Sequence, residues 1–227
     1  MDRVVCYGAT RNIYDQLVPT LRSLTAHTKV DRIYVMAEDD RIGFVPPKNV
    51  TVLNVSGQRI FDPYGPNYNS RWTWMVLMKA ALTKVLPVQE HKALMLDVDT
   101  VIQGDIGGLW NYDLTGNYLA GVREPYWTAL KDRLYVNMGV ALFDLDAMRA
   151  DGTDDRIIAA LNEKRYALNE QDCINEICAG HILEIPSEYN VCPFTPPAQV
   201  VRIRHYAGDK GWFDRAEVAE WKIGGTK

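Results

Sequence analysis

The sequence predicts a single α/β domain whose sheet begins with parallel strands, and three observations support that fold class. Apolar segments of strand length alternate with a segment of helical periodicity over the first 55 residues, which is the pattern of βαβ units. A later apolar segment stops at two acidic residues, and open α/β sheets bind their ligands at such strand ends. The 227 residues contain no repeat or linker, so one domain with a full core is the simplest organisation.

The N-terminal part is expected to form the parallel unit. Residues Arg3–Tyr7 and Arg32–Ala37 have the composition of buried strands, and the apolar positions within Tyr14–Ala26 repeat at helical spacing. A third strand is expected at Val50–Val55. Strand, helix and strand in succession form a right-handed parallel crossover. Neither G-x-G-x-x-G nor the P-loop pattern occurs in the sequence, so a classical dinucleotide fold and a P-loop enzyme are not supported.

The remaining elements follow from the same periodicities. A loop rich in turn formers is expected at Ile60–Ser70, and a helix is expected at Arg71–Leu86, where Pro87 ends it. Further segments of regular structure are strands Tyr118–Val122, Tyr135–Leu145 and Val200–Arg204, and helices Ile157–Leu161 and Cys173–Cys178. Strands interspersed with helices agree with an α/β fold.

Two carboxylates end one of the most apolar strands. Ala93–Leu96 is an uninterrupted apolar run, and Asp97 and Asp99 follow it with Val98 between them. In an extended chain, residues two apart face the same side at about 6–7 Å, so the two anions repel each other. A hard divalent cation, Mg²⁺ or Mn²⁺, relieves that repulsion and also binds substrate phosphates. A pair of solvated surface acids is the alternative, whereas an EF-hand is excluded because its loop glycine and glutamate are missing.

Other candidates lie at strand and helix boundaries. Asn137 and Gly139 interrupt a long apolar strand, where a glycine indicates a bulge or the close approach of another backbone or a ligand. Asn137 needs hydrogen-bond partners there, which a polar ligand could supply. Asn169 and the acids after it fit either a helix N-cap with first-turn acids or a functional site. His205 follows the last strand and precedes two glycines and Lys210, which makes it a candidate ligand-binding histidine.

Composition and charge exclude several functional classes. The net charge is −4 and no basic run exceeds two residues, which argues against nucleic-acid partners and an electrostatic membrane anchor. The sequence has no 18-residue apolar run and no signal-peptide core, so a cytoplasmic location is expected. The four cysteines, Cys6, Cys173, Cys178 and Cys192, lack metal-binding spacing and are expected to be buried, reduced thiols.

Four motifs in fixed order resemble those of the retaining glycosyltransferase family 8, the group that contains glycogenin and bacterial galactosyltransferases. They are the strand with D-x-D at Leu94–Asp99, N-x-G at Asn137–Gly139, E-Q-D at Glu170–Asp172 and H-x-x-G at His205–Gly208. None is specific alone, but together they extend over nearly the whole chain. The resemblance implies a GT-A fold, a Rossmann-like mixed sheet flanked by helices, as one domain over residues 1–227. Its nucleotide-binding half would be residues 1–100, and residues 101–227 would bind acceptor and donor sugar.

The resemblance also implies the members of the site. Asp97, Asp99 and His205 take the positions that hold Mn²⁺ (or Mg²⁺) against the pyrophosphate of the donor. The positions implied for catalysis near the donor sugar are Glu124, Glu170, Gln171 and Asp172. The positions implied for donor binding are Tyr7, Gly8 and Ala9 beside the uracil, Arg71, Val98 and Gly208 along the donor, Asn137 and Gly139 near its sugar, and Lys210 as a cation for the diphosphate.

Two departures from the family pattern bear on this expectation. The family's H-x-x-G-x-x-K-P-W reads H-Y-A-G-D-K-G-W here, one residue shorter before Lys210 and with Gly211 in place of proline. Glu124 and Glu170 stand where aspartate is common, so the preferred donor sugar can differ from that of other members. The expected activity is metal-dependent, retaining transfer of a hexose, glucose or galactose, from a UDP-sugar to an unidentified sugar or protein acceptor. A homodimer is compatible with it.

Two other functions compete with this expectation. The string D-V-D-T-V from Asp97 resembles the first motif of haloacid-dehalogenase-type phosphatases, and Gly208–Asp214 resembles their last. Against a phosphatase, that first motif normally follows the first strand, whereas here three predicted strands precede it. A non-catalytic nucleotide-sugar-binding protein would keep the same motifs. In a transferase, Gln171 would be a poor nucleophile, which favours front-side attack by the acceptor, while Glu170 or Asp172 stay open as nucleophiles.

Overall fold

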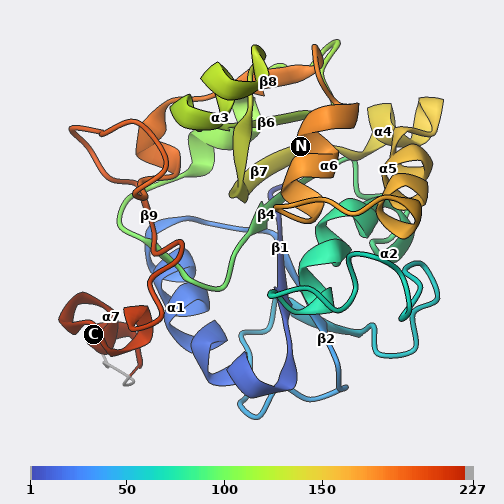
Figure 1. The fold of residues 1–227 in the computed structure, drawn as a ribbon. Coiled ribbons are helices and arrows are strands. Elements are labelled where there is room, and N and C mark those ends of the chain that lie inside the picture. The colour runs from blue at the N-terminus through green and yellow to red at the C-terminus, as the bar shows by residue number, and fades with distance from the viewer. Residues whose placement is uncertain (1, 223–227) are drawn as a thin grey trace.

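A seven-stranded mixed sheet forms the centre of the computed structural model, which describes residues 2–222 (Figure 1). Its strands lie in the order β3-β2-β1-β4-β7-β6-β8. The first four pair in parallel, β7 runs antiparallel to both β4 and β6, and β8 is parallel to β6. The strand bounds are β1 Val4–Ala9, β2 Arg32–Ala37, β3 Val50–Asn54, β4 Lys92–Leu96, β6 Leu119–Arg123, β7 Val136–Asp144 and β8 Ile182–Glu184.

A small second sheet joins the middle of the chain to its C-terminal part. Strand β5 (Thr100–Ile102) follows β4 after a short turn and pairs antiparallel with β9 (Ile203–His205). Thr100 is the partner of His205 in this ladder. The pairing therefore brings β9 to the carboxyl end of β4, where the parallel strands end.

Helices cover both faces of the large sheet (Figure 1). Alternating residues of β1 belong to two separate apolar clusters: Val5 and Tyr7 pack with α1 and α7, whereas Val4 and Cys6 pack with the helices of the opposite face. The first face carries α1 Leu17–His27 and α7 Ala216–Lys222, and the opposite face carries α2 Leu82–Val85, α4 Leu145–Asp151, α5 Thr153–Glu163 and α6 Glu170–Ile177. The other helices are α3 Pro125–Lys131 and the 3-10 helices η1 Arg11–Gln16, η2 Trp74–Ala81, η3 Gly107–Asn111, η4 Ser187–Tyr189 and η5 Trp212–Asp214.

The structure confirms the predicted α/β class and the parallel unit of β1, α1 and β2. The expected helix Arg71–Leu86 is wrong at its start, because the chain is extended at Thr73 and then forms η2 before the single turn of α2. The expected strand Val200–Arg204 is displaced to Ile203–His205. Helix α3 is not predicted from the sequence, because none of its residues is buried and it has no apolar periodicity; only Pro125 at its first position indicates it.

Two further expectations can be compared with the described residues. Cys6, Cys173 and Cys178 are buried and Cys192 is half-buried, and all four are free thiols. Within residues 2–222, no helix is both long and apolar enough to cross a lipid bilayer.

Candidate active site

The acidic pair lies in a tight turn at the carboxyl end of β4. The chain turns at Val98 and Asp99 and enters β5 at Thr100. Two hydrogen bonds fix the turn: Thr100 Oγ1 donates to the Asp97 carbonyl (2.7 Å) and the Asp97 N–H donates to the Gly139 carbonyl (2.9 Å). The expected extended geometry of the pair is therefore wrong, because a turn rather than the strand period brings the two carboxylates together.

His205 completes the cluster. Its Nε2 lies 3.4 Å from an Asp99 carboxylate oxygen and 3.8 Å from one of Asp97. One ligand atom from each of the three side chains lies within 4.8 Å of the other two. Burial alone would lower the pKa of His205, but the two carboxylates raise it to about 10. In turn, burial would raise the pKa of Asp99, and the charge of His205 outweighs this and lowers it.

The donor set of this cluster fits a divalent metal ion. Carboxylate oxygens are the preferred ligands of Mg²⁺ and Mn²⁺, and first-row transition metals accept an imidazole nitrogen more readily than Mg²⁺ does. The His205 side chain is 3% exposed, whereas those of Asp97 and Asp99 are 31% and 27% exposed. A cation between them would therefore be anchored from the protein side and open to phosphate oxygens on the other.

The N-x-G motif makes room for the His205 ring. A β-bulge shifts the pairing of β6 and β7 between Gly121 and Val122, opposite the segment of β7 that contains Gly139. A Cβ atom on Gly139 would lie 2.1 Å from His205 Cε1 and 2.7 Å from each ring nitrogen. The predicted bulge is confirmed, whereas the group that approaches this glycine is the His205 side chain and not another backbone or a ligand.

A chain of buried amides connects His205 to Glu124. Asn190 Oδ1 lies 2.9 Å from His205 Nδ1, and Asn190 Nδ2 donates to Asn137 Oδ1 (2.9 Å). Asn137 also accepts from the Gly139 N–H (2.9 Å) and donates to Glu124 Oε1 (2.6 Å). The partners that Asn137 needs in its strand are thus protein groups. Burial raises the pKa of Glu124, although its amide donors oppose the shift.

The E-Q-D motif forms the first turn of α6 and extends this network. Gln171 Nε2 donates to Glu124 Oε1 (3.2 Å) and Tyr135 Oη (3.3 Å), and its Oε1 accepts from a backbone N–H of β7 (3.0 Å). Tyr135 donates to Asp172 Oδ1 (2.9 Å), and Lys131 Nζ lies 3.5 Å from the same oxygen. Both ends of the Gln171 amide are therefore held by the protein.

Asn169, directly before this motif, has a strained backbone. It occupies the expected N-cap position of α6 but makes no side-chain cap, because its φ is +52° and its ψ is −130°. Such a conformation costs a non-glycine residue about 1–3 kcal/mol and is most common at ligand sites. Its Nδ2 donates to Ser70 Oγ (2.8 Å), whereas its buried Oδ1 has no hydrogen-bond partner in the described part of the chain. The start of α6 is therefore fixed by its surroundings rather than by its own backbone preference.

Lys79 is a site residue that none of the sequence motifs contains. It lies on η2, is 5% exposed, and places Nζ 2.7 Å from Asp97 Oδ1 and 3.1 Å from Glu170 Oε1. Burial opposes its charge, but the two carboxylates raise the pKa of Lys79. Burial also raises the pKa of Glu170, against the effect of Lys79. A lysine within the apolar string W-M-V-L-M-K-A-A-L was the available signal, because a buried lysine needs charged partners.

The predicted base-binding residues lie at the end of β1. The Tyr7 side chain and Ala9 are fully buried in the core. Gly8 lies between them, where a Cβ atom would approach Met75 Cγ to 3.1 Å. Val98 is also buried, with 7% of its surface exposed. Contacts of these residues with a donor stay predictions, and Tyr7 could make them only through its backbone.

Three other predicted donor contacts are on the surface. Arg71 is exposed, with its guanidinium carbon 4.0 Å from the centroid of the Trp72 ring. Gly208 and Lys210 are exposed in the segment after β9, and Gly208 has a φ of +79°. No hydrogen bond or ion pair among residues 2–222 joins Arg71 or Lys210 to the acid–imidazole cluster. Their roles stay predictions as well.

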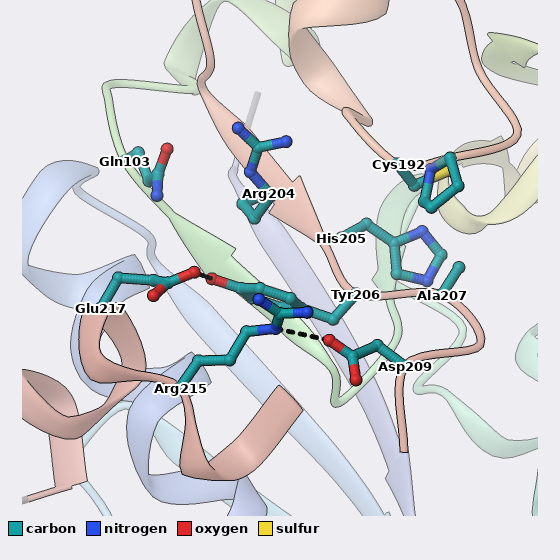
Figure 2. Close-up of a pocket in the computed structure, with 10 residues that line it drawn as sticks. Gln103, Cys192, Arg204, His205, Tyr206, Ala207, Asp209, Arg215 and Glu217 are labelled. Atoms are coloured by element: carbon teal, nitrogen blue, oxygen red, sulfur yellow. Dashed lines mark hydrogen bonds and ion pairs between the residues drawn. The ribbon is translucent and has the colours of Figure 1, made fainter. Parts of the chain in front are cut away.

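A cavity of about 690 Å³ adjoins the cluster, because His205 also lines it (Figure 2). Its wall combines hydrogen-bond donors, acceptors and an aromatic ring, from Gln103, Arg204, Tyr206, Asp209, Arg215 and Glu217. Arg215 is paired with Asp209 at 2.5 Å. The Arg204 side chain, by contrast, has no hydrogen-bond or ion-pair partner within residues 2–222. The cavity therefore offers an uncommitted guanidinium in the wall that it shares with His205.

The mixed sheet, with an acid pair at the end of its central strand and an imidazole brought to that pair, has the architecture expected of the GT-A fold. The comparisons with known proteins agree. The sequence model of glycosyl transferase family 8 matches residues 10–216, and the chain belongs to this family. The phosphatase alternative is thereby set aside.

Relatives of this chain include proteins from several bacteria. Lipopolysaccharide 1,2-glucosyltransferase of Escherichia coli K12 is 25% identical over 209 residues, which cover 82% of this chain and 61% of the relative. Glycosyltransferase GlyA of Streptococcus pneumoniae is 23% identical over 194 residues, 83% of this chain and 28% of the relative. A putative glycosyltransferase of Haemophilus influenzae is 29% identical over 124 residues, 49% of this chain and 37% of the relative. The matched part thus spans between about a quarter and three-fifths of these relatives.

Solved structures share the fold over nearly the full chain. Galactosyltransferase LgtC, in complex with donor and acceptor sugar analogs, superposes with a TM-score of 0.74 at 17% identity, covering 99% of this chain and 97% of LgtC. Glycosyltransferase GlyE of Streptococcus pneumoniae gives a TM-score of 0.73 at 17% identity, with 98% and 60% covered. Mouse xyloside xylosyltransferase 1 gives 0.68 at 16% identity, with 92% and 98% covered. At these identities the likeness shows the GT-A fold.

Proposed function

We propose that this glycosyltransferase moves a hexosyl group, glucose or galactose, from a UDP-sugar to a sugar or protein acceptor, retains the anomeric configuration, and uses Mn²⁺ or Mg²⁺. The observation that carries the proposal is the convergence of Asp97, Asp99 and His205 beside Lys79 at the carboxyl end of β4. The carboxyl ends of parallel strands are where open α/β sheets bind nucleotides, which supports residues 1–100 as the nucleotide-binding half.

The chemistry requires stabilisation of a leaving diphosphate. As the bond between the sugar C1 and the phosphate oxygen breaks, negative charge accumulates on UDP, and a divalent cation held by Asp97, Asp99 and His205 would act as a Lewis acid on its oxygens. Lys79 supplies a second positive charge. Asp97 and Glu170 hold its ammonium group in place, so the charge is preorganised before the donor binds.

The groups expected around the donor sugar favour front-side attack. Gln171 is an amide, both ends of which are already hydrogen-bonded, and it is therefore a poor nucleophile. The carboxylates of Glu170 and Asp172 are engaged by Lys79 and Tyr135. We infer that the acceptor hydroxyl attacks from the side of the leaving group. The C1–O bond to the acceptor forms as the C1–O bond to phosphate breaks, and the hydroxyl proton passes to the departing phosphate oxygen.

We infer that a saccharide acceptor enters the cavity beside His205 (Figure 2). A volume of about 690 Å³ lies within the range of small-molecule sites. The mixed polar wall matches sugar hydroxyls. Arg204→Ala should therefore raise the KM for a saccharide acceptor and leave hydrolysis of the donor by water unchanged.

We also propose that the enzyme acts in the cytoplasm. Its four cysteines are all free, which is the state that the reducing cytoplasm maintains. Cell fractionation with an antibody against the chain tests this location, and recovery in a membrane or extracellular fraction would contradict it.

The proposed transferase activity is tested by measuring UDP release from UDP-glucose and UDP-galactose with and without Mn²⁺. Asp97→Ala and Asp99→Ala should each reduce release by about a thousandfold, because several kcal/mol of charge stabilisation are lost. Asp113→Ala is the matched control, since Asp113 accepts hydrogen bonds only from Thr115 in an exposed turn. Binding of UDP without turnover of either donor would instead indicate a nucleotide-sugar-binding protein and overturn the proposal.

A further inference from the structure

Asn190 is a fully buried side chain with two polar partners. It follows η4, and its backbone is fixed by the Asn190 N–H donating to the Ser187 carbonyl (3.0 Å) and by Thr195 Oγ1 donating to the Asn190 carbonyl (2.6 Å). Its side chain spans the space between His205 Nδ1 and Asn137 Oδ1, at 2.9 Å from each. None of the four sequence motifs contains it.

The direction of these hydrogen bonds is determined by a backbone N–H, which can act only as a donor. The backbone N–H of Gly139 can only donate, and it donates to Asn137 Oδ1 (2.9 Å). Asn137 must therefore present its oxygen on this side and its Nδ2 to Glu124 (2.6 Å). Because the Asn137 oxygen faces Asn190, Asn190 must present Nδ2 there and turn its own Oδ1 toward His205.

An amide oxygen at 2.9 Å from His205 Nδ1 requires that Nδ1 carries the proton. The other ring nitrogen, Nε2, is the one that faces Asp99 and Asp97. We propose that Asn190 is a positioning residue for the metal centre: it selects the His205 tautomer whose Nε2 is free to bind a cation and fixes the ring at that angle. The inference rests on the metal dependence proposed above. Groups of this kind change metal affinity about 10–100-fold when they are removed.

The same side chain links the metal centre to the donor-sugar end of the site. Through Asn137 the chain of hydrogen bonds reaches Glu124, which also accepts from Gln171. Asn190, Asn137 and His205 are all at most 5% exposed, so water cannot readily replace a missing partner. The position of the His205 ring and that of the Glu124 carboxylate are therefore set by one continuous network.

Two variants separate this role from a merely structural one. Asn190→Leu keeps the size of the side chain but removes the acceptor for Nδ1. Asn190→Asp keeps an acceptor for Nδ1 and loses only the donor to Asn137. Affinity for Mn²⁺ alone, measured near pH 7 from the EPR signal of the free ion, should fall 10–100-fold in Asn190→Leu and stay within about threefold in Asn190→Asp.

Asn175→Leu is the matched control. Asn175 is equally buried but bonds only to backbone groups, at Val136 and Gln171, so it should lose stability without losing Mn²⁺ affinity. His205→Ala calibrates complete loss of the ligand. If His205→Ala binds Mn²⁺ as the wild type does, the proposed metal centre fails. If His205→Ala loses affinity but Asn190→Leu does not, or if folded Asn190→Asp loses as much as His205→Ala, only the role of Asn190 is refuted. If Asn190→Leu does not fold, the comparison of Asn190→Asp with His205→Ala still tests the role of Asn190.

Discussion

The closest packing in the site is between Gly139 and His205, and it makes Gly139→Ala a direct test of the geometry. The added methyl group would lie 2.1 Å from His205 Cε1, whereas ordinary contacts begin near 3.4 Å. The difference, 3.4 minus 2.1, means that the ring has to move by about 1.3 Å. Neither the Gly139 backbone nor the His205 ring can easily move. Gly139 is hydrogen-bonded to Asn137 and Asp97, and the ring is hydrogen-bonded to Asn190.

Gly139→Ala should have two effects, one on stability and one on activity. Overpacking a buried site by one methyl group costs about 1–3 kcal/mol, which in a chain of this size lowers the melting temperature by roughly 2–12 °C. A misplacement of about 1 Å at reacting or ligating groups can cost about a hundredfold in rate. We therefore expect Gly139→Ala to fold, to melt earlier, and to lose about a hundredfold in kcat/KM for UDP release.

The assay compares Mn²⁺ affinity and UDP release in Gly139→Ala with the same measurements in Gly57→Ala. A Cβ atom on Gly57 meets nothing within 4 Å and its backbone is not in the left-handed region, so this control should behave as the wild type. Wild-type Mn²⁺ affinity in Gly139→Ala would refute the reasoning, since it would show that the His205 ring is not held against Gly139 when the metal binds.

Three further predictions concern buried charges. Lys79→Met leaves the buried Glu170 carboxylate without its cation, so the free energy of unfolding in urea should fall by about 3–5 kcal/mol at pH 7. The loss should be smaller at lower pH, because burial raises the pKa of Glu170 and the carboxylate takes up a proton as the pH falls; an equal loss at pH 7 and at the lower pH would contradict this. Binding of a metal at His205 Nε2 displaces a proton held with a pKa of about 10, so the Mn²⁺ dissociation constant should fall about tenfold for each pH unit between about 6 and 9; a flat profile from free-ion EPR is the contrary result. Glu90→Gln weakens the acceptor of Arg32 (2.7 Å) and should lower the free energy of unfolding by about 1–3 kcal/mol at neutral pH. Burial would raise the pKa of Glu90, but its hydrogen-bond donors hold that pKa below the usual range. The stabilisation from Glu90 is therefore fully present above the unfolded-state pKa and is lost as the pH falls through the lowered native pKa. Urea titrations at pH 7 and pH 3 should accordingly show a smaller difference between Glu90→Gln and the wild type at pH 3.

The parts of the fold that the sequence predicts well are those whose burial leaves a simple pattern. Strands β1, β2 and β4 are covered on both faces, so they appear as continuous apolar runs, and α1 buries one stripe and shows helical periodicity. Helix α3 buries no residue and leaves no pattern. The 3-10 helix η2 is apolar nearly all round, so its period could not be distinguished from that of an α-helix.

The residues of the site also divide into those that the sequence predicts and those that it does not. Asp97 could be found because it follows a strand, His205 because it stands at the end of one, and Gly139 because it interrupts one. Lys79 leaves only a weak local signal, a lysine within an apolar string, and Asn190 leaves none, because their importance lies in contacts with residues distant in the sequence: Asn190 meets Asn137 across 53 positions. No local rule predicts such a contact, because only the tertiary fold brings the two segments together.

The charges of the site explain how three acids can share it before any ligand arrives. Asp97, Asp99 and Glu170 would repel one another strongly if they were alone, yet Lys79 lies between Asp97 and Glu170, and protonated His205 lies against Asp99. Lys79 and protonated His205 thus balance the acids before any metal binds, so the site is preformed by folding. Binding of a divalent cation would then be an exchange, in which the proton of His205 leaves as the cation enters. Lys79, which has no such proton to release at neutral pH, would stay charged beside the cation, held between Asp97 and Glu170.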